Sequence, residues 1–529
     1  MIFMRFKPHY KQLRIDEFFD SFNNLPKNNR WVALGDNLPW DAIDQMYQRH
    51  INNKKVGRRE KPSRMVIGAM IIKHTLKLSD IETISQIQEN PFMQYMVGLE
   101  EYNPHEPIFD PSLLTYVRKR LDIDDINFIT AIMSGKITEF EESCKKSEDS
   151  DSSTGSNLKT NKHNSDSSSS SQEPQFSEND FVDESGQYHK GSLKIDATCC
   201  DAEVRYPTDL DLLHDGLEVT NQQIKILCKA LGLKLPNTNM KKAEKYYQRI
   251  IKKRRKSRNA IRSTIEKLLA YLKRDKDILL SIIAKRYDYF YLLPPRHQRL
   301  YKTVLTMYHQ QLWMFKSNKR SCKDRIISLF QDHIRPIVRG KAKARTEFGA
   351  KIGAAVVDGF TYIDQLSWDA YNEKEDLIIH VQKYKERFGY LPAKIYADKI
   401  YMNRDNRRYM KAMHILQMCP ALGRPPKEAK TPEYKAKMAK ASGERNEVEA
   451  TFGTMKRAYG ANNIRAKLPN TSACWIGMCA FVKNIKKFMK VLLFVPTFIR
   501  GLLIFYWLEI LGLLWSQIVT VNYKLKLVA

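Results

Sequence analysis

The order of short strands and helices in the second half of the chain constrains the fold more than any other feature. Two runs of strand-forming residues, 351–357 and 361–368, flank Asp358-Gly359, a dipeptide typical of the type I′ turn that joins antiparallel strands. The pattern then predicts an amphipathic helix over 373–388 and a strand over 393–398. A further helix and a short strand follow before residue 420.

A strand over 192–199, in which apolar and polar residues alternate, precedes this series. With residues 204–345 set aside as an insertion, the order is strand, hairpin, helix, strand, helix, strand, helix. That order predicts an α/β protein with an RNase H-like core. In such a core the first and fourth strands lie side by side, so residues near the ends of 192–199 and 393–398 are expected to be neighbours.

The last helix of this series, over 442–459, carries one acid at the edge of its buried face. At 100° per residue, one apolar stripe contains Val448, Phe452, Met455 and Tyr459. A second stripe, offset by roughly 60°, contains Arg445, Glu449 and Lys456. Glu444 and Glu447 are expected to point away from both stripes. An ordinary amphipathic helix with an Arg445–Glu449 ion pair would show the same pattern.

Several acids could accompany Glu449. Asp398 ends the strand over 393–398, whereas Asp358 is explained by its turn. Near the first strand the residues alone leave a choice among Asp196, Asp201, Glu203 and Asp209, and an acid at a strand end is often only a cap or turn residue.

The charge of the chain points to a polyanionic partner. The formal net charge is +29, and residues 250–276 are densely basic and predicted to be helical. Like charges at this density repel unless a counterion such as a phosphate backbone is present, so nucleic acid is favoured over a membrane, although a solvated helix face is the simpler alternative. The candidate DNA-binding residues are Lys252, Lys253, Arg254, Arg255, Lys256, Arg339, Lys341, Lys343 and Arg345.

Changes in composition divide the chain into four regions. Residues 1–140 read as short helices, either a helix-turn-helix-like DNA reader or a plain bundle. Residues 141–190 are Ser-rich and predicted to be a disordered linker, and 191–490 form the core. Residues 491–529 are a hydrophobic tail, for which a buried helix or a self-association surface is favoured over a membrane span. Scattered cysteines and the lack of an apolar leader favour a reducing cytoplasm.

Three stretches resemble the bacterial insertion-sequence transposases of the DDE type. The spacing Arg-x3-Glu-x6-Lys from Arg445 to Lys456 resembles the signature around their last acid, although Ser442 stands where they often have Tyr. ADKIYMNRDN resembles the segment around their second acid, Asp398 here. The run DAT…YPTD-x-x-LL resembles their first-acid region and selects Asp196. The resemblance covers most of 1–490 and also favours DNA binding by the N-terminal helices.

The resemblance implies phosphodiester chemistry at Asp196, Asp398 and Glu449. These carboxylates would hold two Mg²⁺ ions, with Mn²⁺ as a substitute, while Arg445 and Lys456 contact phosphate. Water would cut the element end, and the freed 3′-hydroxyl would attack target DNA.

The implied partners are double-stranded DNA, both the terminal inverted repeats and the target, and further copies of the chain in a dimer or larger oligomer on that DNA. The alternatives are an RNase H-like nuclease without strand transfer and a non-catalytic DNA-binding descendant, which would have lost one of the acids.

Overall fold

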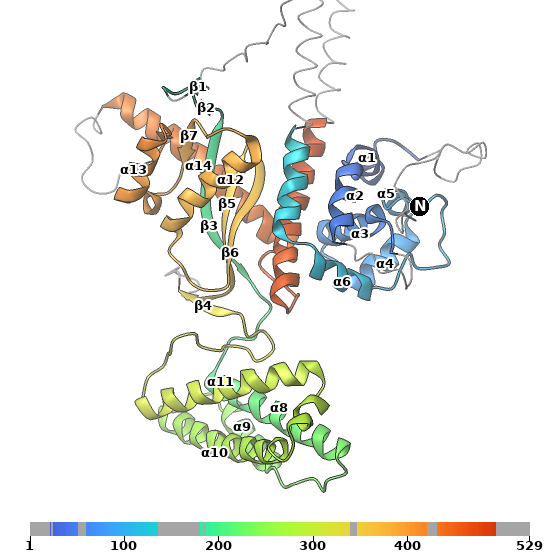
Figure 1. Cartoon of the computed structure of the whole chain (residues 1–529), viewed down its shortest axis with the longest axis vertical. Helices are drawn as coiled ribbons and strands as arrows, with labels where there is room; N and C mark the ends of the chain where they lie inside the picture. The colour runs from blue at the N-terminus through green and yellow to red at the C-terminus, as the bar shows by residue number, and fades with distance from the viewer. Residues whose placement is uncertain are drawn as a thin grey trace, which may run out of the picture.

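The computed structural model describes residues 22, 25–50, 60–135, 180–184, 186–338, 346–419 and 431–492. These residues form N-terminal helices, a mixed sheet covered by helices, and a helical body that extends beyond one end of the sheet (Figure 1). The protein is therefore of the α/β class, as predicted. Within the described ranges no helix combines the length and apolar character that a membrane crossing requires.

The sheet places the first and fourth core strands side by side, as the strand order predicts. Its order is β4-β5-β3-β7-β8, and β6 pairs with β5. The pairing of β3 with β5 is antiparallel, whereas β3 with β7 and β7 with β8 are parallel. The strands are β3 (Ser192–Asp201), β4 (Arg335–Val338), β5 (Thr346–Val357), β6 (Phe360–Ser367), β7 (Lys394–Tyr396) and β8 (Leu416–Gln417).

The hairpin between β5 and β6 turns at Asp358-Gly359, as predicted. Both residues have positive φ, 49° and 80°, which is the left-handed geometry that a type I′ turn requires at its two central positions. This confirms that Asp358 belongs to a turn.

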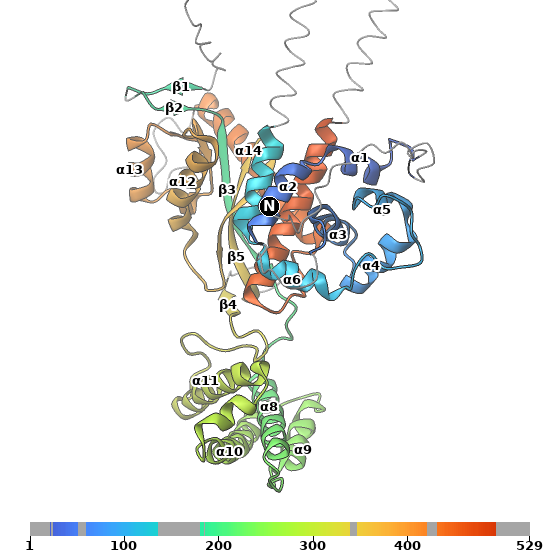
Figure 2. The same cartoon turned by 45° about the vertical axis from the view of Figure 1, so that its right-hand side comes forward.

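Helices cover both faces of the sheet. On one face lies α12 (Asp376–Phe388). It packs closely on Gly353 of β5, where an added Cβ would lie 2.8 Å from an Asp376 carboxylate oxygen and 3.2 Å from His380. On the other face lies α14 (Pro432–Tyr459), which packs along β3 (Figure 2). The short helices η3 (Glu373–Glu375), η4 (Lys399–Tyr401) and α13 (Arg404–Ala412) lie between these strands and helices in the sequence.

Two asparagines cover the outer edge of β6. Asn127, from a helix over 123–135, donates to the Ile363 carbonyl at 2.8 Å and accepts from the Ile363 N–H at 3.1 Å. Asn484, from a helix over 469–492, makes the same pair of bonds with Thr361 at 2.7 and 2.8 Å. These amides therefore occupy backbone groups that an edge strand would otherwise leave open.

The N-terminal helices share one hydrophobic core with the sheet. The short helices predicted for this region are present, and α4 begins with a capping box in which Ser79 and Glu82 each accept from the other's backbone N–H. His74 of α3 packs edge-on against Trp475 at 4.9 Å. The helices are α1 (Arg30–Asn37), α2 (Trp40–Arg49), α3 (Ser63–Leu76), α4 (Asp80–Glu89), α5 (Pro91–Met96) and α6 (Ser112–Arg120).

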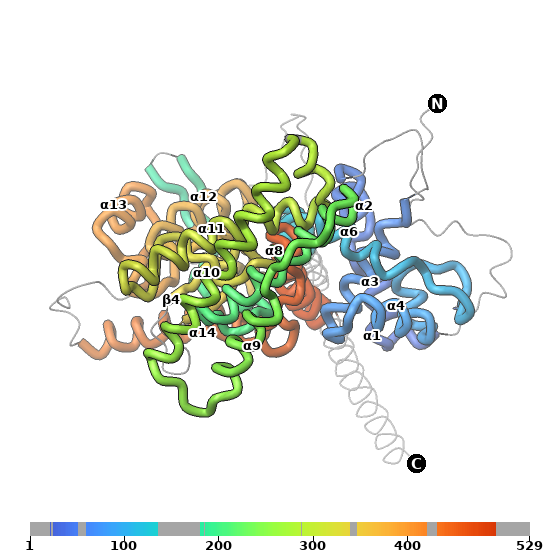
Figure 3. The backbone as a smooth tube through the Cα atoms, turned by 90° about the horizontal axis from the view of Figure 1, so that it is seen from below, coloured from blue at the N-terminus to red at the C-terminus, as the bar shows by residue number. Residues whose placement is uncertain are grey.

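The helical insertion between β3 and β5 has hydrophobic clusters of its own. It lies in front of the sheet when the molecule is seen from below (Figure 3). Its chain leaves and returns at one point, where the Ala202 N–H donates to the Phe348 carbonyl at 2.8 Å. Its elements are α8 (Asp209–Ala230), α9 (Met240–Ile251), α10 (Arg258–Ile283), η2 (Tyr287–Leu292) and α11 (Pro295–Ser317).

Several boundaries differ from the predicted ones. Residues 335–338, assigned to the insertion, form β4 of the sheet because they pair with the start of β5. Residues 181–189, assigned to the linker, include the hairpin of β1 (Phe181–Val182) and β2 (Tyr188–His189). The last helix, predicted over 442–459, begins ten residues earlier, because Thr431 caps α14 and Pro432 follows it. Most of the predicted linker and tail lies outside the described residues.

Candidate active site

Asp196 lies in the centre of the sheet, on the face of β3 that meets α14. Its strand pairs with β5 on one side and with β7 on the other, and the Asp196 carboxylate accepts a hydrogen bond from the Ala197 N–H at 2.8 Å. Burial raises the pKa of Asp196 to about 6; the negative charges of Glu373 and Asp398 add to the rise, and Arg445 opposes it. Asp196 thus lies within electrostatic reach of two other acids and one cation.

Asp398 follows β7 at the position that continues its pairing with β3. Each paired residue of β7 carries a number 202 higher than its partner, as in Ser192 with Lys394, and the same offset takes Asp196 to Asp398. Asp398 is exposed and accepts from the Lys399 N–H at 2.7 Å, which caps η4. The parallel register therefore brings the two predicted aspartates to neighbouring strands at the same level of the sheet.

Glu449 lies on α14, beside the buried face of the helix. The predicted apolar stripe is confirmed, since Val448, Phe452, Met455 and Tyr459 are all buried. Each such side chain contributes about 1.5–3 kcal/mol by its burial, which holds the helix on the sheet.

Arg445 lies between Glu449, which it contacts, and Asp196, on which its charge acts. Its guanidinium lies 2.9 Å from the Glu449 carboxylate. The Glu449 side chain remains 52% exposed, so it can still turn toward a ligand. Lys456 is half-buried farther along the helix, where its charge acts on Cys199 of β3.

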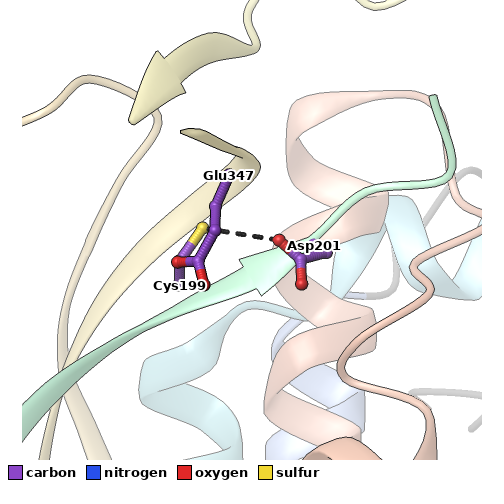
Figure 4. Close-up of side chains that lie close together, drawn as sticks. All are labelled: Cys199, Asp201 and Glu347. Carbon is purple, nitrogen blue, oxygen red and sulfur yellow. Dashed lines mark hydrogen bonds between the residues drawn. The ribbon is translucent and has the colours of Figure 1, made fainter. Parts of the chain in front are cut away.

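The carboxylates of Asp196, Asp398 and Glu449 do not form a compact ligand group by themselves. Among the described residues, two other groups bring three donor atoms within 4.8 Å of one another, Cys199/Asp201/Glu347 and His214/Asp215/Glu218. The first joins the end of β3 to the start of β5 (Figure 4), and the Cys199 thiol donates to Asp201 at 3.9 Å. Burial raises the pKa of that thiol well above its usual value, and the nearby Asp201 adds to the rise, so Cys199 keeps its proton and donates it.

Glu444 and Glu447 lie outside both stripes, as predicted, but the expectation that they therefore face away from the rest of the site is wrong. Lys194 of β3 binds both, with its Nζ 2.6 Å from Glu444 and 2.5 Å from Glu447. The two glutamates are one helical turn apart and flank the apolar stripe on the side opposite Arg445, so they also reach the sheet.

Sequence reasoning also missed Glu373. Its charge is the largest electrostatic contribution to the raised pKa of Asp196. Glu373 begins η3, which Asn406 ties to η4 by donating to the Lys374 and Tyr401 carbonyls at 2.7 and 2.9 Å. The sequence showed it only as the first residue of a helix.

Comparisons with known families match both ends of this architecture. Residues 19–120 match a family described as "Transposase domain (DUF772)", and residues 395–486 match "Transposase DDE domain". The chain carries two transposase domains. The predicted family, the DDE transposases of bacterial insertion sequences, is thereby confirmed.

A curated relative adds little beyond this. A 90-residue segment, 17% of this transposase, is 33% identical to the "Uncharacterized protein ORF8 in nfe locus" of Rhizobium meliloti and covers 42% of that protein's length. No solved structure was found to match the chain. The DDE domain match contains Asp398, Arg445, Glu449 and Lys456, whereas Asp196 lies before it.

The basic run predicted to bind DNA at Lys252–Lys256 lies in a loop. The prediction that Lys252–Lys256 is helical is wrong. The run connects α9 to α10, and the helix resumes only after Ser257, which caps α10. All five of its side chains are exposed, and none forms an ion pair with an acid in the part of the chain that the structure describes. Arg339, Lys341, Lys343 and Arg345 lie outside the described residues.

Proposed function

We propose that this transposase binds the ends of its insertion sequence and performs metal-dependent strand cleavage and strand transfer at Asp196, Asp398 and Glu449. The pairing of β3 with β7 at an offset of 202 carries the proposal, because it supports a shared site for the two aspartates. The strand order and the helix that brings Glu449 alongside support an RNase H-like core.

The donor set of this site suits a divalent cation. Asp196, Asp398 and Glu449 offer carboxylate oxygens, which are the ligands that Mg²⁺ and Mn²⁺ prefer. The raised pKa of Asp196 reflects burial and neighbouring negative charge, which a bound cation would offset. Bound divalent ions supply an activated water and neutralise the leaving oxygen of a phosphodiester.

The cationic residues have complementary roles in this proposal. Arg445 holds Glu449 beside the sheet and presents further N–H donors to a phosphate, and Lys456 adds a second positive charge on the same flank of α14. The exposed run Lys252–Lys256 would contact the DNA backbone without reading its sequence. The N-terminal helices would read the terminal repeats, and two or more copies would assemble on DNA in the cytoplasm.

The test uses the purified full chain and linear double-stranded DNA that carries the element ends. Wild type should cut at the ends with Mg²⁺ or Mn²⁺ and not with EDTA. Asp196→Asn, Asp398→Asn and Glu449→Gln should each lose more than the roughly 10–100-fold that removal of an outer-shell partner costs. Glu433→Gln, on the exposed first turn of α14, is the matched control and should cut normally.

The outcomes separate the alternatives. Normal cutting by any of the three variants would remove that residue from the site, and cutting in EDTA would refute the metal chemistry. Products in which the cut end is joined to target DNA distinguish a transposase from a nuclease that only cuts.

A further inference from the structure

A buried lysine connects the catalytic strand to the helix that carries Glu449. The Lys194 side chain is 11% exposed and lies between β3 and α14, where it binds Glu444 at 2.6 Å and Glu447 at 2.5 Å. Only the lysine is buried, since Glu444 and Glu447 are 40% and 37% exposed, and the cost of desolvating its ammonium offsets part of the attraction, so the contact matters more for geometry than for stability. The effect of Lys194 to consider is therefore the orientation of α14.

A rotation of α14 about its axis would separate Lys194 from its two glutamates. Glu447 and Glu449 are about 160° apart around the helix, with the buried stripe between them. Apolar contacts of that stripe are non-directional and tolerate a small roll of the helix. A roll that lifted Glu447 from Lys194 would move the Arg445–Glu449 pair relative to the sheet by the same angle.

Lys194 and Asp196 belong to the same strand, β3. Lys194 and Asp196 are two residues apart on the same face of β3, about 7 Å along the strand. Lys194 pairs with Val356 of β5 on one side and with Tyr396 of β7 on the other, so its backbone is held by both neighbours. Whatever fixes α14 to Lys194 therefore fixes it relative to Asp196.

Other charged groups surround the ion pair of Lys194 with Glu444 and Glu447. The β5–β6 turn lies beside it, since a Cβ added to Gly359 would lie 3.4 Å from the Glu447 carboxylate and 3.0 Å from the Lys487 side chain. Asp358 of that turn also feels the charges of Lys194 and Glu447. Arg445 and Glu449 lie on the other side of the apolar stripe, where the charge of Arg445 reaches Asp196 and opposes the rise of its pKa.

We infer that Lys194 is a positioning residue that holds α14 in the rotation at which Arg445 and Glu449 face Asp196. This inference rests on the function proposed above, because it assigns Lys194 a role in the same site. Lys194 itself touches neither DNA nor metal in this scheme and acts through Glu444 and Glu447.

The test compares Lys194→Met, which keeps the length of the side chain, with Lys194→Arg and with the exposed control Lys411→Met. Lys194→Met should cut element-end DNA about 10–100-fold more slowly and need more Mg²⁺ for half-maximal cutting, as the loss of an outer-shell partner does. Its affinity for that DNA in EDTA should be unchanged. Hydrogen exchange along α14 should be faster, and Lys194→Arg should restore both cutting and protection.

Normal cutting by Lys194→Met, or unchanged exchange along α14, would overturn the inference. If Lys194→Met does not fold, the double variant Glu444→Gln/Glu447→Gln removes the same contacts from the helix and is judged by the same two readouts. The two proposals fail separately, because hydrogen exchange requires no DNA. If wild type cuts no element-end DNA but Lys194→Met still exchanges faster along α14, the proposed function is refuted and the role of Lys194 in orienting the helix is not.

Discussion

Asp275 offers a sharp test of how the insertion tolerates a buried charge. It lies in the middle of α10 with no exposed surface, and neither carboxylate oxygen has a hydrogen-bond partner in the part of the chain that the structure describes. Burial raises its pKa from 3.8 to about 7, against the opposing charge of Arg274. The folded insertion therefore holds Asp275 as a neutral acid below pH 7.

The direction of the pH dependence follows from this shift. Below pH 3.8 both folded and unfolded states are protonated, and Asp275 costs nothing by ionisation. Between pH 4 and 7 only the unfolded state ionises, so stability falls by about 1.4 kcal/mol per pH unit. Above pH 7 the folded state ionises too, and the loss levels off at about 4 kcal/mol. From pH 5 to pH 8 the wild type should lose about 2–3 kcal/mol through this residue.

Asp275→Asn removes the ionisation with little change in shape. Urea unfolding of the full chain at pH 5 and pH 8 measures the effect. The signal is the fluorescence of Trp313, the single tryptophan between residues 204 and 345, and it is identified by subtracting the fluorescence of Trp313→Phe. The stability of the Asn variant relative to wild type should rise by about 2–3 kcal/mol between the two pH values. The same difference at both would refute the reasoning, because Asp275 would then be ionised or paired in the folded state.

Two further predictions concern the DNA contact and the sheet edge. Replacing Lys252–Lys256 with glutamine should lower the slope of log Kd against log salt by about 4–5, because each phosphate contact releases roughly 0.9 counterion; equal slopes would mean that the run is only solvated. Asn484→Ala should lower the free energy of unfolding by about 2–4 kcal/mol in urea titrations, because it leaves the N–H and C=O of Thr361 buried without partners. A loss no larger than that of the exposed control Asn462→Ala would show that these groups find water instead.

Local patterns predicted the elements of the core better than their partners. Strand alternation, the Asp358-Gly359 turn and the apolar stripe of α14 depend on neighbouring residues, and each is confirmed. The orientation of Glu447 depends on Lys194, which lies 253 residues away, so a helical wheel alone could not find it. Asn127 likewise meets Ile363 across 236 residues.

Two other differences had weak or overlooked signals. The four residues of β4 lie beside a basic run that obscures their strand character, and only pairing with β5 identifies them. The loop at Lys252–Lys256 was missed because its long side chains suit a helix, although Ser257 is a good N-cap and marked the boundary. The site of Asp196 and Asp398 was predictable to the level of neighbouring strands, whereas the approach of Glu373 was not.

The position of the insertion affects how the chain is made. Asp201 of β3 pairs with Gly349 of β5, so at ordinary rates of synthesis the first strand waits roughly 7–30 s for its neighbour to leave the ribosome. The helices of the insertion emerge in that interval and bury their own cores from local contacts, which form quickly. By closing on themselves they return the chain beside Ala202. The insertion thereby turns a long-range strand pairing into a short one before the sheet is assembled.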